Sequence, residues 1–300
     1  MSGLLQMTGP VLDLVYRVAA FPVSGQEAVV TGFDLYPGGG YNAMYAARQA
    51  GMDVALGGSL GTGPLADTIL AAMQETGITC AGMRTPDIDQ GCCTVIMEPD
   101  GERSFLAFPG AEGRITLDTL DRIDMSAYSW VLLSGYSLHY PQARTALSSW
   151  AARLPDRVRL LFDPSPVIAE LPDAILAPVM ARADWISANA QEAAVLTGQQ
   201  DATAAVTALA RGRHGAVLRQ GADGAVVSFD GTTQKIAPHN VQAIDTNGAG
   251  DTHIGSFIAL LDRIRDPIKA AHYANVAAAL SATRSGPATA PAAEKVLPYL

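Results

Sequence analysis

Apolar residues in this chain occur in short runs that alternate with segments of helical periodicity. Strand-like runs occupy residues 4–7, 54–60, 130–134, 158–162, 185–188, 216–220 and 241–245. Between them, apolar residues recur at the spacing of one helix face, as in Leu65, Ile69, Leu70 and Met73, and again in Ile254, Phe257, Ile258 and Leu261. This alternation predicts an α/β fold, with a doubly wound, mostly parallel sheet and helices on both faces.

Two stretches depart from the alternation and predict a second, smaller sheet. Residues 91–113 change to a period of two, with a hairpin formed by 93–97 and 103–108. Residues 28–36 alternate in a similar way. We expect a small β-sheet, built from about 14–36 and 91–113, inserted in a single domain that spans residues 1–300.

Composition excludes several classes of function. The chain has 300 residues, of which 49% are hydrophobic and 16% charged, so it is globular. Its net charge of −9 argues against binding to nucleic acid or to an anionic membrane. No apolar run reaches the length of a membrane span, and the N-terminus lacks the features of a signal peptide.

The positions of cysteine and lysine residues bear on the cellular compartment and on the type of nucleotide site. The cysteines are Cys80, Cys92 and Cys93, and an odd number with an adjacent pair is a poor disulfide framework. We therefore expect a cytoplasmic protein. No lysine follows a Gly-x-x-x-x-Gly run, which excludes a P-loop.

Residues 245–256 carry the strongest chemical signal. Gly248-Ala249-Gly250 lies between the strand-like run 241–245 and the helical pattern that follows, so it predicts a strand-to-helix turn. Free N–H groups at a helix N-terminus form an anion site. Asp251 places a carboxylate inside that site, where it suits a base that deprotonates a hydroxyl attacking phosphorus. The ordinary alternative is a glycine turn with a stabilising aspartate at the helix N-terminus.

The motif Asp-Thr-x-Gly-Ala-Gly-Asp before an apolar helix resembles the C-terminal signature of the ribokinase-like (PfkB) carbohydrate kinases. The resemblance implies that residues 248–251 (Gly248, Ala249, Gly250 and Asp251) form the anion hole and that Asp251 is the catalytic base.

A second stretch resembles the N-terminal signature of the same family. Pro37-Gly38-Gly39-Gly40-Tyr41-Asn42 precedes an alanine-rich helix that ends near Gly51. The stretch departs from the family at Pro37, Gly39 and Tyr41, which leaves the identity of the sugar open. The resemblance implies a substrate site formed by Asp13, Gly38, Gly39 and Asn42, with Phe108 as an apolar surface beside it. Taken alone, Asp13 is better explained as a solvated carboxylate in a loop after residues 4–7.

The resemblance also implies a nucleotide site. Asn189, Gly221, Gly224 and Asn275 would bind ATP, and Glu192 would hold magnesium through water. Local structure offers alternatives, since Asn189 and Glu192 fit a helix capping box and residues 221–224 fit a tight hairpin turn. Asn275 lies in an alanine-rich stretch that also fits a packing helix.

Two further features follow from the resemblance. The small sheet would be a lid over the sugar and would join two copies in a homodimer. A monovalent cation, such as potassium, would lie beside the anion hole, with Asp245, Asn247, Ser281, Arg284 and Gly286 around it.

The sequence thus predicts an ATP- and magnesium-dependent phosphotransferase acting on a hydroxyl of a sugar or sugar-like small molecule. A nucleoside kinase of the adenosine or pseudouridine type is the alternative, and a non-catalytic sugar- or nucleotide-binding protein is a rival from another class. A dehydrogenase is the most distant alternative, because it rests on Gly61-x-Gly63 alone. The sequence does not specify the substrate.

Overall fold

The computed structural model describes residues 3–82 and 84–300. Within these residues the main sheet has nine strands, in the order β15-β14-β13-β12-β11-β10-β1-β4-β6. In chain order they are β1 (Gly3–Gln6), β4 (Asp53–Leu56), β6 (Thr79–Cys80), β10 (Trp130–Ser134), β11 (Arg159–Asp163), β12 (Trp185–Asn189), β13 (Gly215–Arg219), β14 (Ala225–Phe229) and β15 (Thr232–Ile236). Pairing is parallel from β6 to β13 and antiparallel at β14 and β15, which confirms the predicted mostly parallel sheet.

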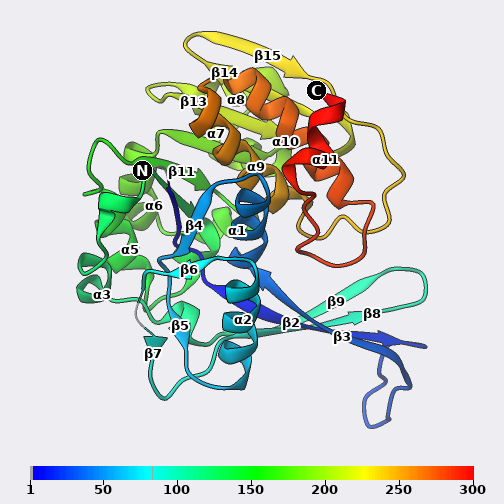
Figure 1. Cartoon of the computed structure of the whole chain (residues 1–300). Helices are drawn as coiled ribbons and strands as arrows, with labels where there is room; N and C mark the ends of the chain where they lie inside the picture. Colours follow the sequence, from blue (N-terminus) through cyan, green and yellow to red (C-terminus); the bar gives the residue numbers. More distant parts are fainter. Residues whose placement is uncertain (1–2, 83) are drawn as a thin grey trace.

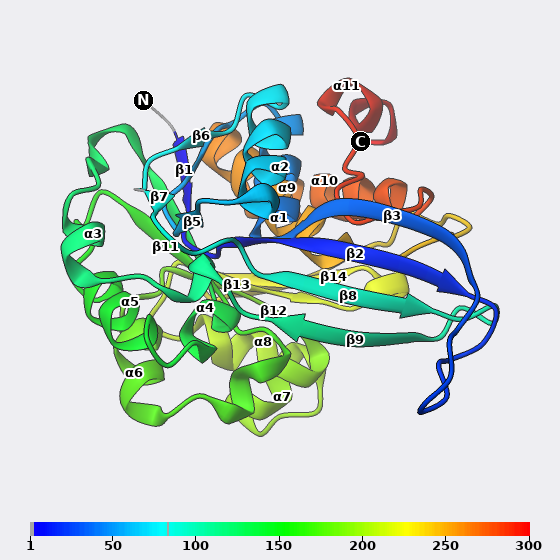
Figure 2. The same ribbon diagram turned by 90° about the horizontal axis from the view of Figure 1, so that it is seen from below.

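Helices cover both faces of this sheet (Figure 2). One face carries α1 (Gly40–Gln49), α2 (Pro64–Glu75), α9 (Ala249–Ile264), α10 (Pro267–Ser281) and α11 (Ala293–Val296). The other carries α3 (Leu117–Asp121), α5 (Arg144–Ala151), α6 (Asp173–Arg182), α7 (Ala190–Thr197) and α8 (Ala202–Ala210). The short helix α4 (Gly135–His139) directly follows β10. No helix in the described part of the chain is both long and apolar enough to cross a membrane.

Strand β10 shows why this sequence requires two layers of helices. Trp130 and Leu132 belong to the core shared with α1, α9 and α10, whereas Val131 and Leu133 belong to the core under α5 and α8. Successive side chains of a strand point to opposite faces, so a continuous apolar run is buried only if both faces are covered.

A second sheet of four strands, in the order β3-β2-β8-β9, extends away from the main body (Figure 1). Its strands are β2 (Pro10–Val18), β3 (Val30–Gly39), β8 (Cys92–Met97) and β9 (Arg103–Phe108). The hairpin of β8 and β9 is the one that the period-two pattern predicts. A pair of two-residue strands, β5 (Leu60–Gly61) and β7 (Arg84–Thr85), lies beside the main sheet.

The buried carboxylate of Glu112 fixes both ends of this hairpin. It accepts hydrogen bonds from the amide of Gly91, before β8, and from the amide of Gly110, after β9, each at 2.8 Å. Glu112 is only 2% exposed, so these amides also satisfy an otherwise costly buried charge. The hairpin is therefore anchored at its base, while its far end extends into solvent.

Three expectations about local structure are wrong. Residues 241–245 are not a strand: they lie in an irregular segment, where the amides of Ile244 and Asp245 donate to the carbonyl of Ala282 after α10 and not to a neighbouring strand. Asp13 lies inside β2, paired with Tyr36 and Cys93, and not in a loop. The predicted strand 54–60 ends at Leu56, where a turn leads to β5.

Candidate active site

Four neighbouring parallel strands end in polar residues at the same edge of the main sheet. Ser134 ends β10, Asp163 ends β11, Asn189 ends β12 and Arg219 ends β13. Ser134 lies opposite Asp163 in the register, and Asn189 lies opposite Arg219. The carboxyl ends of strands in open α/β sheets are where ligands bind, so this edge is the first place to look for a site.

Arg219 connects two carboxylates at this edge. Its Nη2 donates to Asp163 Oδ1 at 3.3 Å and to Glu192 Oε2 at 3.2 Å. Asp163 also accepts from the hydroxyls of Ser134, at 3.1 Å, and Ser165, at 3.0 Å. Burial and the charge of Asp163 raise the pKa of Glu192, and the Arg219 guanidinium opposes that rise. The edge thus holds two carboxylates and one guanidinium within hydrogen-bonding distance.

Glu192 is 3% exposed and forms a capping box with Asn189. The Asn189 side chain accepts from the amide of Glu192, and the carboxylate of Glu192 accepts from the amide of Asn189, both at 2.8 Å. The capping-box interpretation is therefore right, and it accounts for the orientation of both side chains. It also leaves the Glu192 carboxylate beside Arg219.

Asp251 lies in the first turn of α9 and marks the centre of the site. Gly248 caps the helix with a φ of 73°, a left-handed conformation that favours glycine, and an added Cβ would collide with the carbonyl of Pro287. Within the described chain, the amides of Gly250 and Asp251 donate to no backbone carbonyl. The turn therefore presents free N–H groups at the positive end of a sixteen-residue helix.

The Asp251 carboxylate is held by Asn42, whose Nδ2 donates to Oδ2 at 3.0 Å across 209 residues of sequence. Burial raises the pKa of Asp251 to about 6, the Asn42 hydrogen bond lowers it, and the charge of Asp163 adds to the rise. A carboxylate with this pKa is mostly ionised at neutral pH, yet it is a stronger base than an ordinary aspartate.

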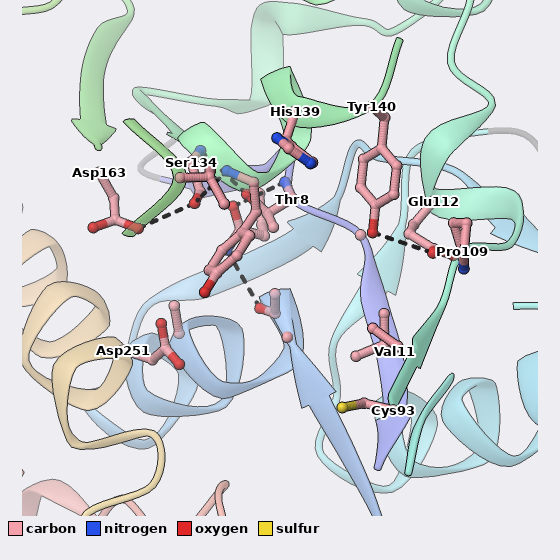
Figure 3. A pocket seen from close by; sticks show the side chains of 18 of the residues that line it. Thr8, Val11, Cys93, Pro109, Glu112, Ser134, His139, Tyr140, Asp163 and Asp251 are labelled. Atoms are coloured by element: carbon pink, nitrogen blue, oxygen red, sulfur yellow. Dashed lines mark hydrogen bonds between the residues drawn. The ribbon is translucent and has the colours of Figure 1, made fainter. Parts of the chain in front are cut away.

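A cavity of about 940 Å³ opens in front of Asp251, between the sheet edge and the small sheet. Figure 3 shows Asp163 and Asp251 on one side of it and Cys93, Pro109 and Tyr140 on the other. The Tyr140 hydroxyl donates to Glu112, so the cavity wall is tied to the base of the hairpin (Figure 3).

Asp13 points into this cavity from β2. Within the described residues its carboxylate makes no hydrogen bond, and an added Cβ on Gly38 would strike that carboxylate. Burial, together with the charge of Asp251, raises the pKa of Asp13 to about 6. Gly39 and the aromatic ring of Phe108, which is 72% exposed, also line the cavity. Of the predicted substrate residues, Asp13, Gly39 and Phe108 therefore line one space, whereas Gly38 and Asn42 do not line it but lie against Asp13 and Asp251, which do.

A second cavity, of about 430 Å³, lies on the other side of the α9 N-terminus. Asn189, Gly221, Gly224 and Asn275, the four predicted ATP-binding residues, all line it. The Asn275 side chain donates to the carbonyl of Ala237 at 3.0 Å, so it also anchors the segment after β15. The two cavities meet at the first turn of α9, where Asp251 faces one and Gly250 faces the other.

The predicted monovalent-cation residues gather only in part. Asp245 accepts from the amides of Asn247, at 2.9 Å, and Gly286, at 3.1 Å. Its third donor is Arg103 Nη2, at 2.9 Å, from the start of β9. Burial alone would raise the pKa of Asp245, but these amides and the guanidinium lower it. Arg284 is exposed and makes no ion pair among the described residues, and the Ser281 carbonyl accepts from Thr289 Oγ1 at 3.0 Å.

Several residues at the site were missing from the sequence-based set. Asp163 and Arg219 could have been found, because each is the last polar residue of an apolar strand. Phe105 and Tyr136 line the substrate-side cavity; Tyr136 follows the apolar run 130–134 within two residues and so carries the same signal, whereas nothing in the local sequence distinguishes Phe105 from other aromatic residues. Arg103 gave no signal, since its partner Asp245 lies 142 residues away.

In the described chain, no group of three or more His, Cys, Asp or Glu side chains is arranged to hold a metal ion.

Comparisons with known proteins agree with this geometry. Residues 9–294 match the family model described as pfkB family carbohydrate kinase. The sugar kinase YegV of Escherichia coli is 30% identical over 255 residues, covering 83% of this chain and 78% of the relative. A ribokinase of Haemophilus influenzae is 28% identical over 298 residues, covering 96% and 95%.

Among solved structures, the adenosine kinase of Sinorhizobium meliloti superposes with a TM-score of 0.86 at 17% identity, covering 100% of this chain and 99% of that one. This likeness concerns the fold. The family match extends over nearly the whole chain and includes both signatures, and it is the finding that identifies the protein. The chain belongs to the pfkB family of carbohydrate kinases, which are phosphotransferases.

Proposed function

We propose that this protein transfers the terminal phosphoryl group of ATP to a hydroxyl of a sugar or sugar-like alcohol, with Asp251 as the general base. The observation that carries the proposal is the position of Asp251. It lies in an anion-binding helix turn, at the junction of two cavities, with a pKa of about 6. A protein that only binds sugar or nucleotide needs no base at that point.

On the substrate side, the unpartnered carboxylate of Asp13 would accept hydrogen bonds from two hydroxyls of the substrate. Gly38 and Gly39 would let the substrate approach the backbone, and Asn42 would orient both the substrate and Asp251. Asp251 then takes the proton from the attacking hydroxyl. Phe108, from the small sheet, would cover the apolar side of the substrate and help to exclude water.

On the nucleotide side, the donors fit a polyphosphate. Of the amides of residues 248–251, those of Gly250 and Asp251 have no backbone partner in the described chain and would face the charge that develops on the transferred phosphoryl group, whereas the Ala249 amide donates to Thr246. The Arg219 guanidinium lies beside that turn, since an added Cβ on Gly250 would be 3.8 Å from its Nη1. Asn189, Gly221, Gly224 and Asn275 would hold the rest of the nucleotide.

Magnesium fits the same edge of the sheet. The carboxylate of Glu192, with Asp163 nearby, would hold the hydrated ion through water, as hard oxygen ligands do. When bound, the ion neutralises charge on the phosphate oxygens.

Potassium beside the anion hole is part of the same proposal, with Asp245, Asn247, Ser281, Arg284 and Gly286 around it. Its support is weaker, because the Asp245 carboxylate already has a guanidinium partner in Arg103. The cation would therefore have to bind main-chain oxygens of this region. Rates measured with and without potassium test this part separately.

A nucleoside is the second candidate substrate. Phe105, Phe108 and Tyr136 give the substrate-side cavity three exposed aromatic rings, which suit a flat base better than a bare sugar. The similarity in fold to an adenosine kinase is compatible with this choice.

We also propose that two copies pair through the small sheet. Its face opposite Asp13 carries exposed apolar side chains, among them Phe33, Leu35 and Leu106, at 48%, 46% and 63% exposure. A cluster of this kind is typical of an interaction surface.

The proposed compartment is the cytoplasm, supported by Cys80, Cys92 and Cys93, which are all free thiols.

The deciding experiment is a panel of sugars and nucleosides assayed with ATP and magnesium, with coupled detection of ADP. We expect turnover on one class of hydroxyl compound and none with NAD-dependent substrates. If no member of a broad panel releases ADP above the ATP-only background, while ATP binds, a binding protein without catalysis becomes the better account.

A further inference from the structure

Tyr136 has a hydroxyl that no other part of the described chain uses. The residue lies in α4, directly after β10, and lines the larger cavity together with Asp163 and Asp251. It is 49% exposed. Its amide donates to Ser134 Oγ at 3.3 Å, but within the described residues its phenol makes no hydrogen bond. The hydroxyl is therefore available to a ligand in the cavity.

The start of α4 holds Tyr136 beside the carboxyl end of β11. Ser134, which caps α4, donates to Asp163 at 3.1 Å and lies opposite it in the register of the sheet. An added Cβ on Gly135 would collide with the carbonyl of Pro164. The backbone on either side of Tyr136 and Asp163 thus packs closely, and the position of the tyrosine is fixed by the main sheet.

The phenol lies within reach of the charges of three carboxylates. Burial raises the pKa of Tyr136, and the charges of Asp163, Asp251 and Glu192 raise it further. Negative neighbours disfavour the phenolate, so the hydroxyl keeps its proton at neutral pH. Tyr136 is therefore a neutral hydrogen-bond donor in surroundings that are otherwise rich in negative charge.

Two other hydroxyls that line this cavity already have partners. Tyr140 donates to Glu112 at 3.3 Å, and Ser134 donates to Asp163. Each of these protons is held by a carboxylate, whereas that of Tyr136 is not. This contrast singles out Tyr136 as the phenol that can bind a ligand oxygen.

The two cavities limit which part of a nucleotide Tyr136 can contact. Tyr136 lines the larger cavity but not the nucleotide-side one. A nucleotide in the smaller cavity reaches the larger one only with its terminal phosphoryl group, past the turn of Gly250 and Asp251. The free amides of that turn approach the group from α9, and Tyr136 approaches it from α4. Phosphoryl oxygens only accept hydrogen bonds, so a neutral donor suits them.

We infer that Tyr136 donates a hydrogen bond to the terminal phosphoryl group of the bound nucleotide, where that group meets Asp251. The inference rests on the proposed function for the assignment of nucleotide and acceptor to their cavities. It adds to that function a side-chain donor on the acceptor side, beyond the amides of the α9 turn. Tyr136 takes no part in removing the proton of the acceptor.

The test is calorimetric binding of ADP and of AMP-PNP, a non-hydrolysable ATP analogue, to the full-length protein with magnesium. Tyr136→Phe keeps the ring and removes only the hydroxyl. We expect about a tenfold weaker affinity for AMP-PNP, the low end for a hydrogen bond to a charged group, because water partly replaces the phenol. For ADP, which lacks the terminal group, we expect less than a twofold change.

A matched control is Tyr299→Phe, the same change at a residue that is 51% exposed and lines neither cavity. It should bind both nucleotides as wild type does. If wild type fails to bind ADP, the proposed function falls. If wild type binds ADP and Tyr136→Phe binds AMP-PNP equally well, the role of Tyr136 alone is refuted. Equal losses for AMP-PNP and ADP also refute it, because they assign the effect to the part that the two nucleotides share.

A spectroscopic measurement tests the same contact with Tyr136 in place. In protein labelled with 3-fluorotyrosine, the ¹⁹F resonance of Tyr136 is the one that Tyr136→Phe lacks. We expect it to shift on adding AMP-PNP with magnesium and to stay nearly unchanged on adding ADP with magnesium. A resonance that does not respond to AMP-PNP would overturn the inference.

Discussion

Replacing Asp251 by asparagine should inactivate the enzyme and stabilise its fold. The pKa of Asp251 rises from 3.8 to about 6, so the folded protein resists ionisation of this carboxyl more than the unfolded chain does. At roughly 1.36 kcal/mol per pKa unit, this difference of about two units costs about 3 kcal/mol when the group is ionised. Asparagine has the same shape and no charge to bury, so Asp251→Asn avoids that cost.

The gain in unfolding free energy of Asp251→Asn over wild type should increase with pH. Because the folded pKa lies above the unfolded one, wild type keeps the favourable contribution of this group below pH 3.8 and loses it as pH rises through 6. By this linkage, Asp251→Asn should exceed wild type in unfolding free energy by about 3 kcal/mol at pH 7.5, but by only about 1 kcal/mol at pH 4.5.

Urea unfolding at the two pH values measures this difference, and a coupled ADP assay measures activity. We expect kcat to fall by about 10²–10⁴-fold, as for the loss of a general base. Asp156→Asn, at an exposed position, should change neither quantity. Equal stability of Asp251→Asn and wild type at pH 7.5 would show that the carboxylate is well solvated. A variant that retains more than about a tenth of the wild-type kcat would remove Asp251 from its catalytic role.

Three further predictions follow from the same geometry. Asp13→Ala should lower kcat/KM for the phosphoryl acceptor by about ten- to a hundred-fold and leave ATP affinity nearly unchanged, because it leaves substrate hydroxyls unpaired. For wild type, kcat/KM should rise with pH through about 6, where Asp13 and Asp251 both ionise. Arg103→Met should make activity respond strongly to potassium, because it leaves the buried carboxylate of Asp245 without its guanidinium.

Each of these has its own contrary result. A loss of ATP affinity in Asp13→Ala with unchanged acceptor constants would mean that the two cavities are assigned the wrong way round. A flat pH profile between 5 and 7 would mean that neither carboxyl limits the reaction. For the third, Arg17→Met is the control, since Arg17 makes its ion pair with Asp34 on the small sheet, away from Asp245. Equal potassium responses in both arginine variants would contradict the assigned role of Arg103.

Local signals were enough to predict the backbone structure at the centre of the candidate site. The turn at Gly248 requires a left-handed backbone, which favours glycine. The apolar face of the helix that follows is formed by residues three and four positions apart, so both features could be predicted from about a dozen residues. The same is true of the capping box of Asn189 and Glu192. In each case the sequence neighbours are also the spatial neighbours.

Contacts between distant segments could not be predicted in this way. The pairing of Arg103 with Asp245 depends on how the small sheet is placed against the main body, which no window of sequence contains. The failed strand at 241–245 has the same origin. Its alternation of apolar residues is suitable for a strand, but the amides of Ile244 and Asp245 bond to the carbonyl of Ala282, a partner that lies after α10 and that no local window of sequence contains.

The sign of the charge around the site is a reason for the proposed anion hole to use backbone amides. The protein carries a net charge of −9, and Asp163, Glu192 and Asp251 all lie close to the place where phosphate would bind. Arg219 already neutralises part of this cluster and has little charge left to attract a polyphosphate. If phosphate binds as proposed, its affinity would come from the free amides of the α9 turn and from a metal ion that accompanies the nucleotide. Such a site would favour nucleotide bound with its metal over free phosphate, and this selectivity would keep Asp251 unhindered until both substrates are in place.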